Sequence, residues 1–160
     1  MTMRRDRATR AARVGLTMLV VGLAGALTLW ACADFTSPVD PTGGLPDVVV
    51  ANPMFERDIQ PMFTKRCAQG GCHTVASAQV GLVLAEGHSY DSLVNHRSSL
   101  SDVYLRVLPG DHTNSWLWRM LQSDQSLRPT YPQMPLAAQP LTANQLQTVV
   151  NWIDQGAPRN

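Results

Sequence analysis

The residues of this chain with the clearest chemical potential lie in RCAQGGCHT, residues 66–74. Cys67 and Cys72 are separated by four residues, and His73 follows Cys72 directly. A cysteine thiolate is both a nucleophile and a metal ligand, and a neutral imidazole is a metal ligand. The cluster therefore has the groups needed to hold a metal or a cofactor.

Two cysteines followed at once by a histidine is the arrangement that attaches c-type haem. The two sulfurs bond to the porphyrin vinyl groups, and the histidine ligates the iron. The usual spacing has two intervening residues, whereas this chain has four, Ala68 to Gly71. Because the vinyl groups are a fixed distance apart, we expect the two extra residues to bulge outward, with Gly70 and Gly71 supplying the backbone freedom.

Two other interpretations of the cluster remain open. A Cys67–Cys72 disulfide would close a small loop, and it would persist in an oxidising compartment. A zinc site needs about four ligands, and the sequence has no second cysteine pair or nearby His-x-x-x-His to complete one. Neither interpretation explains why His73 follows Cys72 directly.

A candidate for a second iron ligand lies near the end of the chain, in YPQMPL. Single-haem cytochromes commonly use a methionine sulfur as the sixth ligand, on a loop before the last helix. Met134 lies in such a place, between Pro132 and Pro135. The two prolines restrict the backbone and would fix the direction of the methionine.

Four helices are expected to position these residues. Residues 55–67 have Phe55, Ile59, Met62 and Phe63 at helical spacing, and Pro61 starts or kinks that helix. Shorter helices are expected at 89–96 and 115–122, the second with Ser115 or Asn114 as its N-cap.

The last helix carries the clearest signals. Thr142 and Gln145 have capping-box spacing, and Gly156 followed by Pro158 stops the helix. Between these signals runs one apolar stripe, made of Leu146, Val149, Val150 and Ile153.

The N-terminus predicts export and a membrane anchor. Five arginines precede an uncharged run from Val14 to Ala33, as in a signal peptide. The run ends in LTLWAC, which resembles the lipobox of bacterial lipoproteins, with Cys32 as the lipidated residue. We therefore expect a signal peptide at 1–31 and a lipidated, Pro/Gly-rich linker at 32–52. An uncleaved membrane anchor is the alternative, since the run is long enough to span a bilayer.

Removing the signal changes the charge and the cysteine count. The 13 basic residues fall to 8 and the 12 acidic residues to 11, so the mature chain carries a net charge near −3. No basic patch remains, and nucleic acid is excluded as an expected partner. With Cys32 lipidated, Cys67 and Cys72 are left as a pair.

From Phe55 to Pro158 the chain resembles a single-haem c-type cytochrome domain of the kind found in bacterial lipoproteins. The resemblance rests on the order of four pieces that cover nearly the whole of residues 53–160. They are Phe55 to His73, Pro109-Gly110-Asp111 with Ser115 and Leu117, Met134-Pro135, and Trp152-Ile153 with Gly156-Ala157-Pro158.

The resemblance implies an all-α domain in which the N- and C-terminal helices cross next to one haem. It implies covalent attachment through Cys67 and Cys72, with His73 and Met134 as axial iron ligands. The function implied is electron transfer, not catalysis, between redox partner proteins in the periplasm or membrane. A haem peroxidase would need an open sixth position, which Met134 argues against.

The other function class is a non-haem structural or interaction lipoprotein stapled by a Cys67–Cys72 disulfide. Several further residues have ambiguous contexts and are not assigned to the site. They are His88, His96, His112, Arg106, Arg119, Trp116, Trp118 and Trp152.

Overall fold

The computed structural model describes residues 40–122, 124–127, 130–136 and 138–160. The chain divides into residues 1–39 and a compact unit, Asp40–Asn160, which is described by itself. The expected signal peptide, Cys32 and the first part of the linker lie outside the described residues. Within those residues, no helix has the length and apolar character required to cross a membrane.

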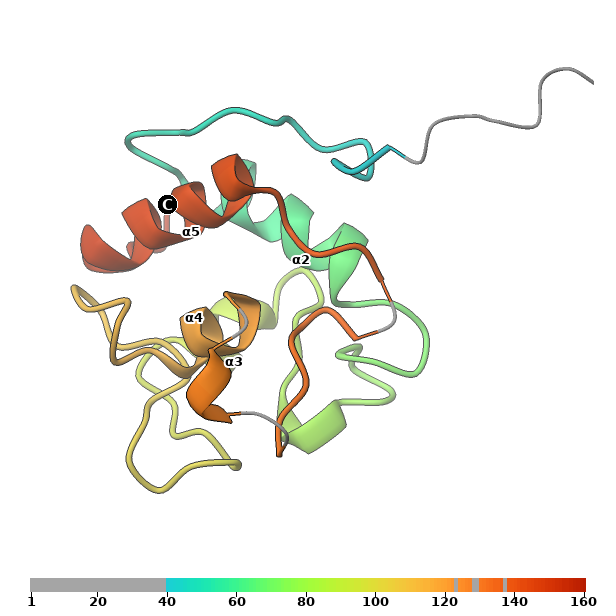
Figure 1. The fold of residues 1–160 in the computed structure, drawn as a ribbon, viewed down its shortest axis with the longest axis vertical. Helices are drawn as coiled ribbons and strands as arrows, with labels where there is room; N and C mark the ends of the chain where they lie inside the picture. The colour runs from blue at the N-terminus through green and yellow to red at the C-terminus, as the bar shows by residue number, and fades with distance from the viewer. Residues whose placement is uncertain (1–39, 123, 128–129, 137) are drawn as a thin grey trace, which may run out of the picture. The chain divides into compact units, whose positions relative to one another are not determined.

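The unit is helical, as the sequence predicts. Its elements are η1 (Phe55–Ile59), α2 (Gln60–Arg66), η2 (Gln79–Gly81), α3 (Ser89–Leu93), α4 (Trp116–Leu121), η3 (Gln125–Leu127) and α5 (Ala143–Asp154). In place of strands, the described residues hold isolated bridges such as Val94 to Val107 and Leu105 to Ser115. Figure 1 shows the helices joined by long loops, and α5 contacts η1 and α4.

The first predicted helix is divided between Ile59 and Gln60, just before Pro61. Residues Phe55–Ile59 form a π-helical turn, and α2 begins at Gln60 with Pro61 in its first turn. Proline is tolerated there because its missing N–H would have no partner within the helix. Phe55, Ile59 and Phe63 are buried on one side, and Cys67 follows directly after the last residue of α2.

Helices α3 and α4 lie where the sequence predicts them, but α3 is shorter. It ends at Leu93 because Val94 is extended and pairs with Val107. Ser115 is the N-cap residue of α4, as expected, although its side chain makes no capping bond. The Ser115 hydroxyl instead donates to the carbonyl of Asp111 at 2.8 Å, and it accepts from the N–H of Leu108.

Helix α5 agrees with its prediction in detail. The Thr142 hydroxyl accepts from the N–H of Gln145, and the Gln145 side chain accepts from the N–H of Thr142, which together form the capping box. Its apolar stripe is buried at Val149, Val150 and Ile153. The helix ends before Gly156, whose φ of 93° lies in the left-handed region that glycine adopts without strain.

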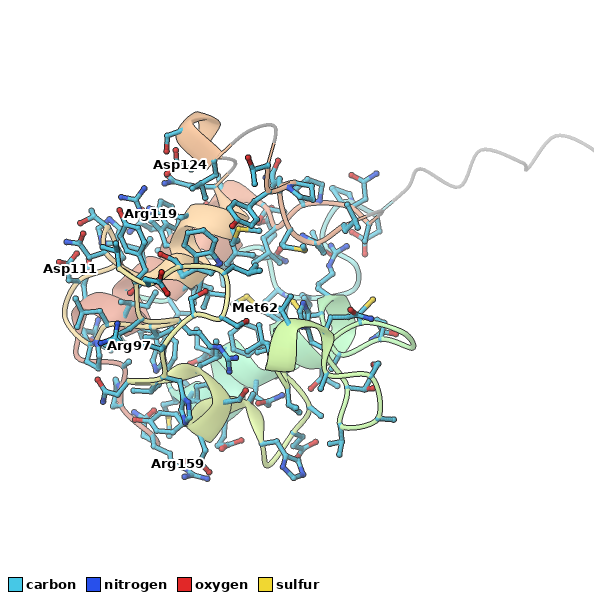
Figure 2. The ribbon with its side chains drawn as sticks, turned by 90° about the horizontal axis from the view of Figure 1, so that it is seen from below. Met62, Arg97, Asp111, Arg119, Asp124 and Arg159 are labelled. Carbon is cyan, nitrogen blue, oxygen red and sulfur yellow. The ribbon has the colours of Figure 1, made fainter. Side chains whose placement is uncertain are left out.

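The core joins both ends of the unit through aromatic contacts. The Phe55 ring lies 5.2 Å from the ring of Trp152 on α5 and 5.2 Å from that of Tyr90 on α3. The Tyr90 hydroxyl donates to the carbonyl of Ala157 at 2.8 Å. Met62 lies toward the middle of the molecule (Figure 2) and is buried. The first and last helical elements therefore share one core.

The compact unit includes residues 40–52, which precede the folded part expected from near Pro53. Leu45 is buried in the core, and the N–H of Val50 donates to the Thr148 hydroxyl on α5 at 3.0 Å. Gly43 has a φ of 62°, and a Cβ there would lie 2.5 Å from the Arg66 guanidinium carbon. This glycine allows a turn and a close approach, so the Pro/Gly-rich composition of residues 40–52 does not indicate a free linker.

Candidate cofactor site

A cavity of about 430 Å³ brings together the residues that the sequence singles out. Cys67, Cys72, His73 and Met134 all line it, although Met134 is distant from the others in sequence. Most of the remaining wall is aliphatic or aromatic, with Leu82, Leu84, Leu93, Leu100, Trp116, Leu117, Met120 and Leu121. This volume lies within the range of pockets that hold small molecules and cofactors, about 300–1,000 Å³.

The loop that carries the cysteines closes back on the end of α2. The N–H of Cys72 donates to the carbonyl of Gln69, and the N–H of His73 donates to the carbonyl of Cys67 at 3.2 Å. Gly70 and Gly71 are exposed, and Gly71 has a φ of 81°. Gly71 thus adopts the left-handed conformation that favours glycine, while Ala68 at the start of the loop packs against the core.

The cysteine thiols have different surroundings. Burial of the Cys67 thiol raises its pKa to about 12, and the neighbouring Cys72 contributes in the same direction. Cys72 is exposed, and the two sulfurs are not joined in the structure. Since the thiolate is the form that reacts in disulfide exchange, burial keeps the Cys67 sulfur in its less reactive thiol form at neutral pH.

The His73 side chain is oriented by the carbonyl of Leu82. Nδ1–H donates to that oxygen at 3.2 Å, and because a carbonyl only accepts, Nδ1 must carry the proton. Burial lowers the pKa of His73, which favours the neutral ring, and the positive charge of Arg106 acts in the same direction. Hydrogen bonds to the main chain of Leu82 and Gln79 oppose this lowering of the pKa. A neutral ring with its proton on Nδ1 carries its lone pair on Nε2, which is the form of imidazole that ligates a metal.

Met134 is partly buried against the core and is held by its main chain. Its N–H donates to the carbonyl of Met120 on α4 at 2.9 Å. The neighbouring Gln133 side chain donates to the carbonyl of Leu121 at 2.8 Å, and the Tyr131 hydroxyl donates to the carbonyl of Leu100. These bonds fix the segment that brings Met134 to the cavity.

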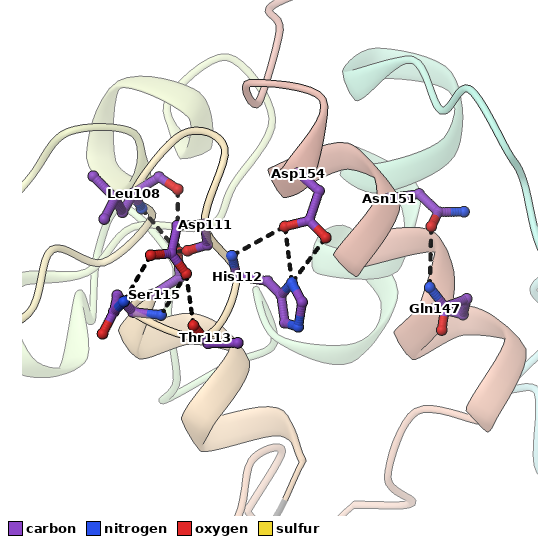
Figure 3. A network of polar contacts seen from close by, with 9 residues as sticks. Leu108, Asp111, His112, Thr113, Ser115, Gln147, Asn151 and Asp154 are labelled. Carbon is purple, nitrogen blue, oxygen red and sulfur yellow. Dashed lines mark hydrogen bonds and ion pairs between the residues drawn. The ribbon is translucent and has the colours of Figure 1, made fainter.

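Two histidines with ambiguous sequence contexts, His88 and His96, are exposed, and neither lines the cavity. His112 also lies outside it, since its Nδ1 bonds to the Asp154 carboxylate at 2.8 Å, as Figure 3 shows. This contact joins the loop before α4 to the end of α5.

The two unassigned arginines differ in their position relative to the cavity. Arg106 lines the cavity. Arg119 lies outside it, in a 2.7 Å ion pair with Asp124 (Figure 2) and with its guanidinium 4.4 Å from the centre of the Tyr104 ring. Of the tryptophans, Trp116 lines the cavity and Trp152 is core.

Two features of the site carry no sequence signal. The acceptor for His73 is a main-chain carbonyl, which every residue possesses, so Leu82 has no distinguishing mark. The main-chain hydrogen bond from Met134 to Met120 likewise cannot be recognised in the sequence.

Within the described residues, no three His, Cys, Asp or Glu side chains form a group able to hold a metal ion.

Comparison with protein-family models, curated proteins and solved structures finds no match to this chain. The chemistry of the site must therefore be judged from its donor set. Two cysteines, a histidine and a methionine line one largely apolar cavity. This set fits a covalently attached haem, because imidazole and thioether are an established axial pair for haem iron.

Proposed function

We propose that the protein is a membrane-tethered electron carrier with one covalently bound c-type haem. The observation that carries this proposal is the meeting of Cys67, Cys72, His73 and Met134 at one cavity. A disulfide-stapled module gives no reason for an imidazole and a distant methionine to face the same apolar space. The geometry thus favours a cofactor over a purely structural cysteine pair.

In this proposal the Cys67 and Cys72 thiols would each add S–H across a haem vinyl group to form a thioether, and His73 and Met134 would ligate the iron. When bound, the haem supplies one-electron chemistry, with its iron alternating between ferric and ferrous as one electron passes from a donor protein to an acceptor protein. The protein contributes the ligands, the apolar surroundings and the exclusion of water. Methionine is a soft, neutral ligand and raises the potential relative to a second histidine.

The proposal places the domain in the bacterial cell envelope, anchored by lipid on Cys32 and facing the periplasm or the cell exterior. Its partners are redox proteins of that compartment. Because Met134 would occupy the sixth position, the protein is proposed as a carrier and not as a haem enzyme.

Covalent attachment is tested by producing the chain together with a haem-attachment machinery. The product should remain red through acid-acetone extraction and show the added mass of one haem. The matched variant Cys67→Ser/Cys72→Ser, produced in the same cells, should contain no haem that resists acid-acetone extraction. Colour that extracts freely, or an intact Cys67–Cys72 disulfide by mass spectrometry, would contradict the proposal and support the stapled module.

The anchor is tested separately with Cys32→Ser. We expect release from the membrane fraction, or faulty processing of the signal, with an unchanged haem spectrum. A variant that stays membrane-bound with the same mass as the parent chain would instead support an uncleaved anchor.

A further inference from the structure

Two polar side chains are buried in the core beside the cavity without lining it. Gln60, the first residue of α2, is 3% exposed, and Ser89, the first residue of α3, is 1% exposed. Neither belongs to the cavity wall. A buried amide or hydroxyl destabilises the fold unless it is hydrogen-bonded, whereas an apolar side chain of similar size has no such requirement. These two residues therefore need a reason beyond packing.

The two side chains form one hydrogen-bonded network. The Ser89 hydroxyl donates to Oε1 of Gln60. The amide nitrogen of Gln60, Nε2, donates to the Thr64 hydroxyl at 3.0 Å and to the carbonyl of Leu84 at 3.2 Å. The amide thus uses both of its N–H groups, and its bond to Leu84 reaches the loop that joins α2 to α3.

Leu84 belongs to the segment that orients His73. The N–H of Leu84 donates to the carbonyl of His73 at 2.7 Å, and the carbonyl of Leu82 accepts from Nδ1–H of the His73 ring at 3.2 Å. Between these two residues, the N–H of Val83 donates to the Ser92 hydroxyl on α3 at 3.0 Å. The segment therefore bonds to His73 at both ends, and side chains of α2 and α3 fix where it lies.

The geometry points to Gln60 as a positioning residue for the proposed iron ligand His73. Gln60 holds the Leu84 carbonyl, and through the chain it fixes the Leu82 carbonyl that sets the direction of the imidazole. This inference rests on the proposed function and adds a residue that neither the cysteine motif nor the cavity wall contains. A firm bond from Nδ1–H to an oxygen makes the imidazole a more basic ligand, which stabilises ferric iron and lowers the potential.

The test compares Gln60→Met with Gln145→Met in the haem-bound protein by redox titration. Methionine has a side chain of similar length but donates no hydrogen bond. Loss of a direct outer-shell partner of a metal ligand typically costs about 10- to 100-fold in metal affinity or activity. Because Gln60 acts one bond further from the ligand, we expect Gln60→Met to raise the equilibrium constant for reduction about threefold, which is about 28 mV for one electron.

Gln145 is the matched control because it is also a buried glutamine, 1% exposed, that bonds through both ends of its amide. Its Oε1 accepts from the N–H of Thr142, and its Nε2 donates to the carbonyl of Thr42. It lies outside the cavity wall. Gln145→Met should therefore destabilise the protein but leave the potential unchanged.

Hydrogen exchange of the His73 Nδ1–H separates positioning from a general loss of stability. In the reduced, haem-bound protein this proton can be followed by NMR, with the N–H of the fully buried Val149 on α5 as the reference for global unfolding. Relative to that reference, we expect the ring proton to exchange up to about tenfold faster in Gln60→Met, as a weakened hydrogen bond allows. In Gln145→Met the two exchange rates should change together.

The outcomes separate this inference from the proposed function. If no haem attaches to the parent chain, the proposed function fails and the inference fails with it. If haem attaches but Gln60→Met keeps the parent potential and the parent exchange of the ring proton, Gln60 serves only the packing of the core and the inference is wrong. An equal shift of the potential in Gln145→Met would also overturn it.

A second variant keeps the inference testable if Gln60→Met fails to accumulate. Ser89→Ala leaves Gln60 in place but removes the hydroxyl that holds its amide. It should raise the potential by less than the amount expected for Gln60→Met and speed exchange of the ring proton in the same sense. An unchanged potential and unchanged exchange in Ser89→Ala would then contradict the inference.

Discussion

The bonds that hold His73 lie within a short stretch of chain, whereas the side-chain and main-chain bonds that hold Met134 and its neighbours run to distant segments. Within the proximal wall (residues 67–84), His73 donates its N–H to Cys67, accepts from the N–H of Leu84 and donates Nδ1–H to Leu82. The far end of this wall is tied to distant residues as well, since Val80 and Leu84 accept from Ser99 and Gln60. Within the distal wall (residues 131–136), the Tyr131 hydroxyl, the Gln133 side chain and the Met134 N–H have partners at residues 100, 121 and 120.

This difference predicts different behaviour of the two walls. A short loop that closes on itself loses little more entropy when the rest of the protein loosens, since the closure cost depends on loop length. The distal wall depends on the packing of α4 and therefore on the whole core. We expect the proximal ligand to stay bound under conditions in which the distal ligand is released.

The largest expected effect is from His73→Ala, which removes the only imidazole that lines the cavity in the described residues. Loss of an outer-shell partner of a metal ligand typically costs about 10- to 100-fold in metal affinity or activity. Loss of the ligand itself should cost more, and little holoprotein should accumulate. The ratio of haem to protein measures this, with the exposed His96→Ala as the matched control. Normal haem content in His73→Ala would contradict its role as ligand.

Met134→Ala should have the next largest effect, confined to the distal side. The haem should remain attached, while the weak sulfur-to-iron band at the red end of the oxidised spectrum disappears and small ligands bind. The potential should fall, and Met134→His should keep six-coordinate iron at a lower potential than the parent.

Met120→Leu is the control for that change, because Met120 lines the same cavity. It should keep the red-end band. A band that survives Met134→Ala but is lost in Met120→Leu would reassign the sixth ligand to Met120.

Tyr131→Phe should loosen the distal wall by a smaller amount. It removes one hydroxyl bond, to the carbonyl of Leu100 at 3.1 Å, worth about 0.5–1.5 kcal/mol. The sulfur-to-iron band should then be lost at a lower denaturant concentration, with haem content unchanged.

Tyr90→Phe is the matched control for this substitution, since it removes the same kind of bond, to Ala157, from the core. It should lower global stability by a similar amount. For each variant, the denaturant concentration at which the band is lost is compared with the midpoint of global unfolding. If the gap between the two is the same in Tyr131→Phe and Tyr90→Phe, the distal wall has no separate role.

How much of each wall can be predicted from the sequence depends on whether its bonds are local or distant. The capping box of α5 and the cysteine loop are local patterns, so their residues can be recognised without knowing the fold. The early end of α3 results from the pairing of Val94 with Val107, which no local signal announces. The position of Met134 in a loop before the last helix can be read from the sequence, whereas its bond to Met120 depends on tertiary packing.

The segment at 40–52 shows how composition can mislead. Prolines and glycines are typical of linkers, but they also permit tight turns and close approaches. Here Gly43 makes room for Arg66, and Leu45 enters the core. Distinguishing these uses requires the partner residue, which lies more than twenty positions away. Arg106 and Arg119 are likewise equivalent in sequence and differ only in their surroundings.

The smallest expected effect concerns the turn that leads into α4, the helix on which the distal wall rests. Bonds from the Asn114 side chain, the Thr113 hydroxyl and the Asn114 N–H lower the pKa of Asp111 to about 2, from 3.8. A carboxyl whose pKa is lowered in the folded state contributes stability that is present above about pH 4 and is lost as pH falls through about 2. Asp111→Asn should therefore be slightly less stable than the parent at neutral pH, by an amount that shrinks below about pH 4 and disappears below about pH 2. Urea denaturation across this range measures the difference, and a gap that persists or widens in acid would contradict the role of the ionised carboxyl. Because the bonds are solvent-exposed and lie on the turn rather than on the distal wall itself, the sulfur-to-iron band should be the same in both proteins.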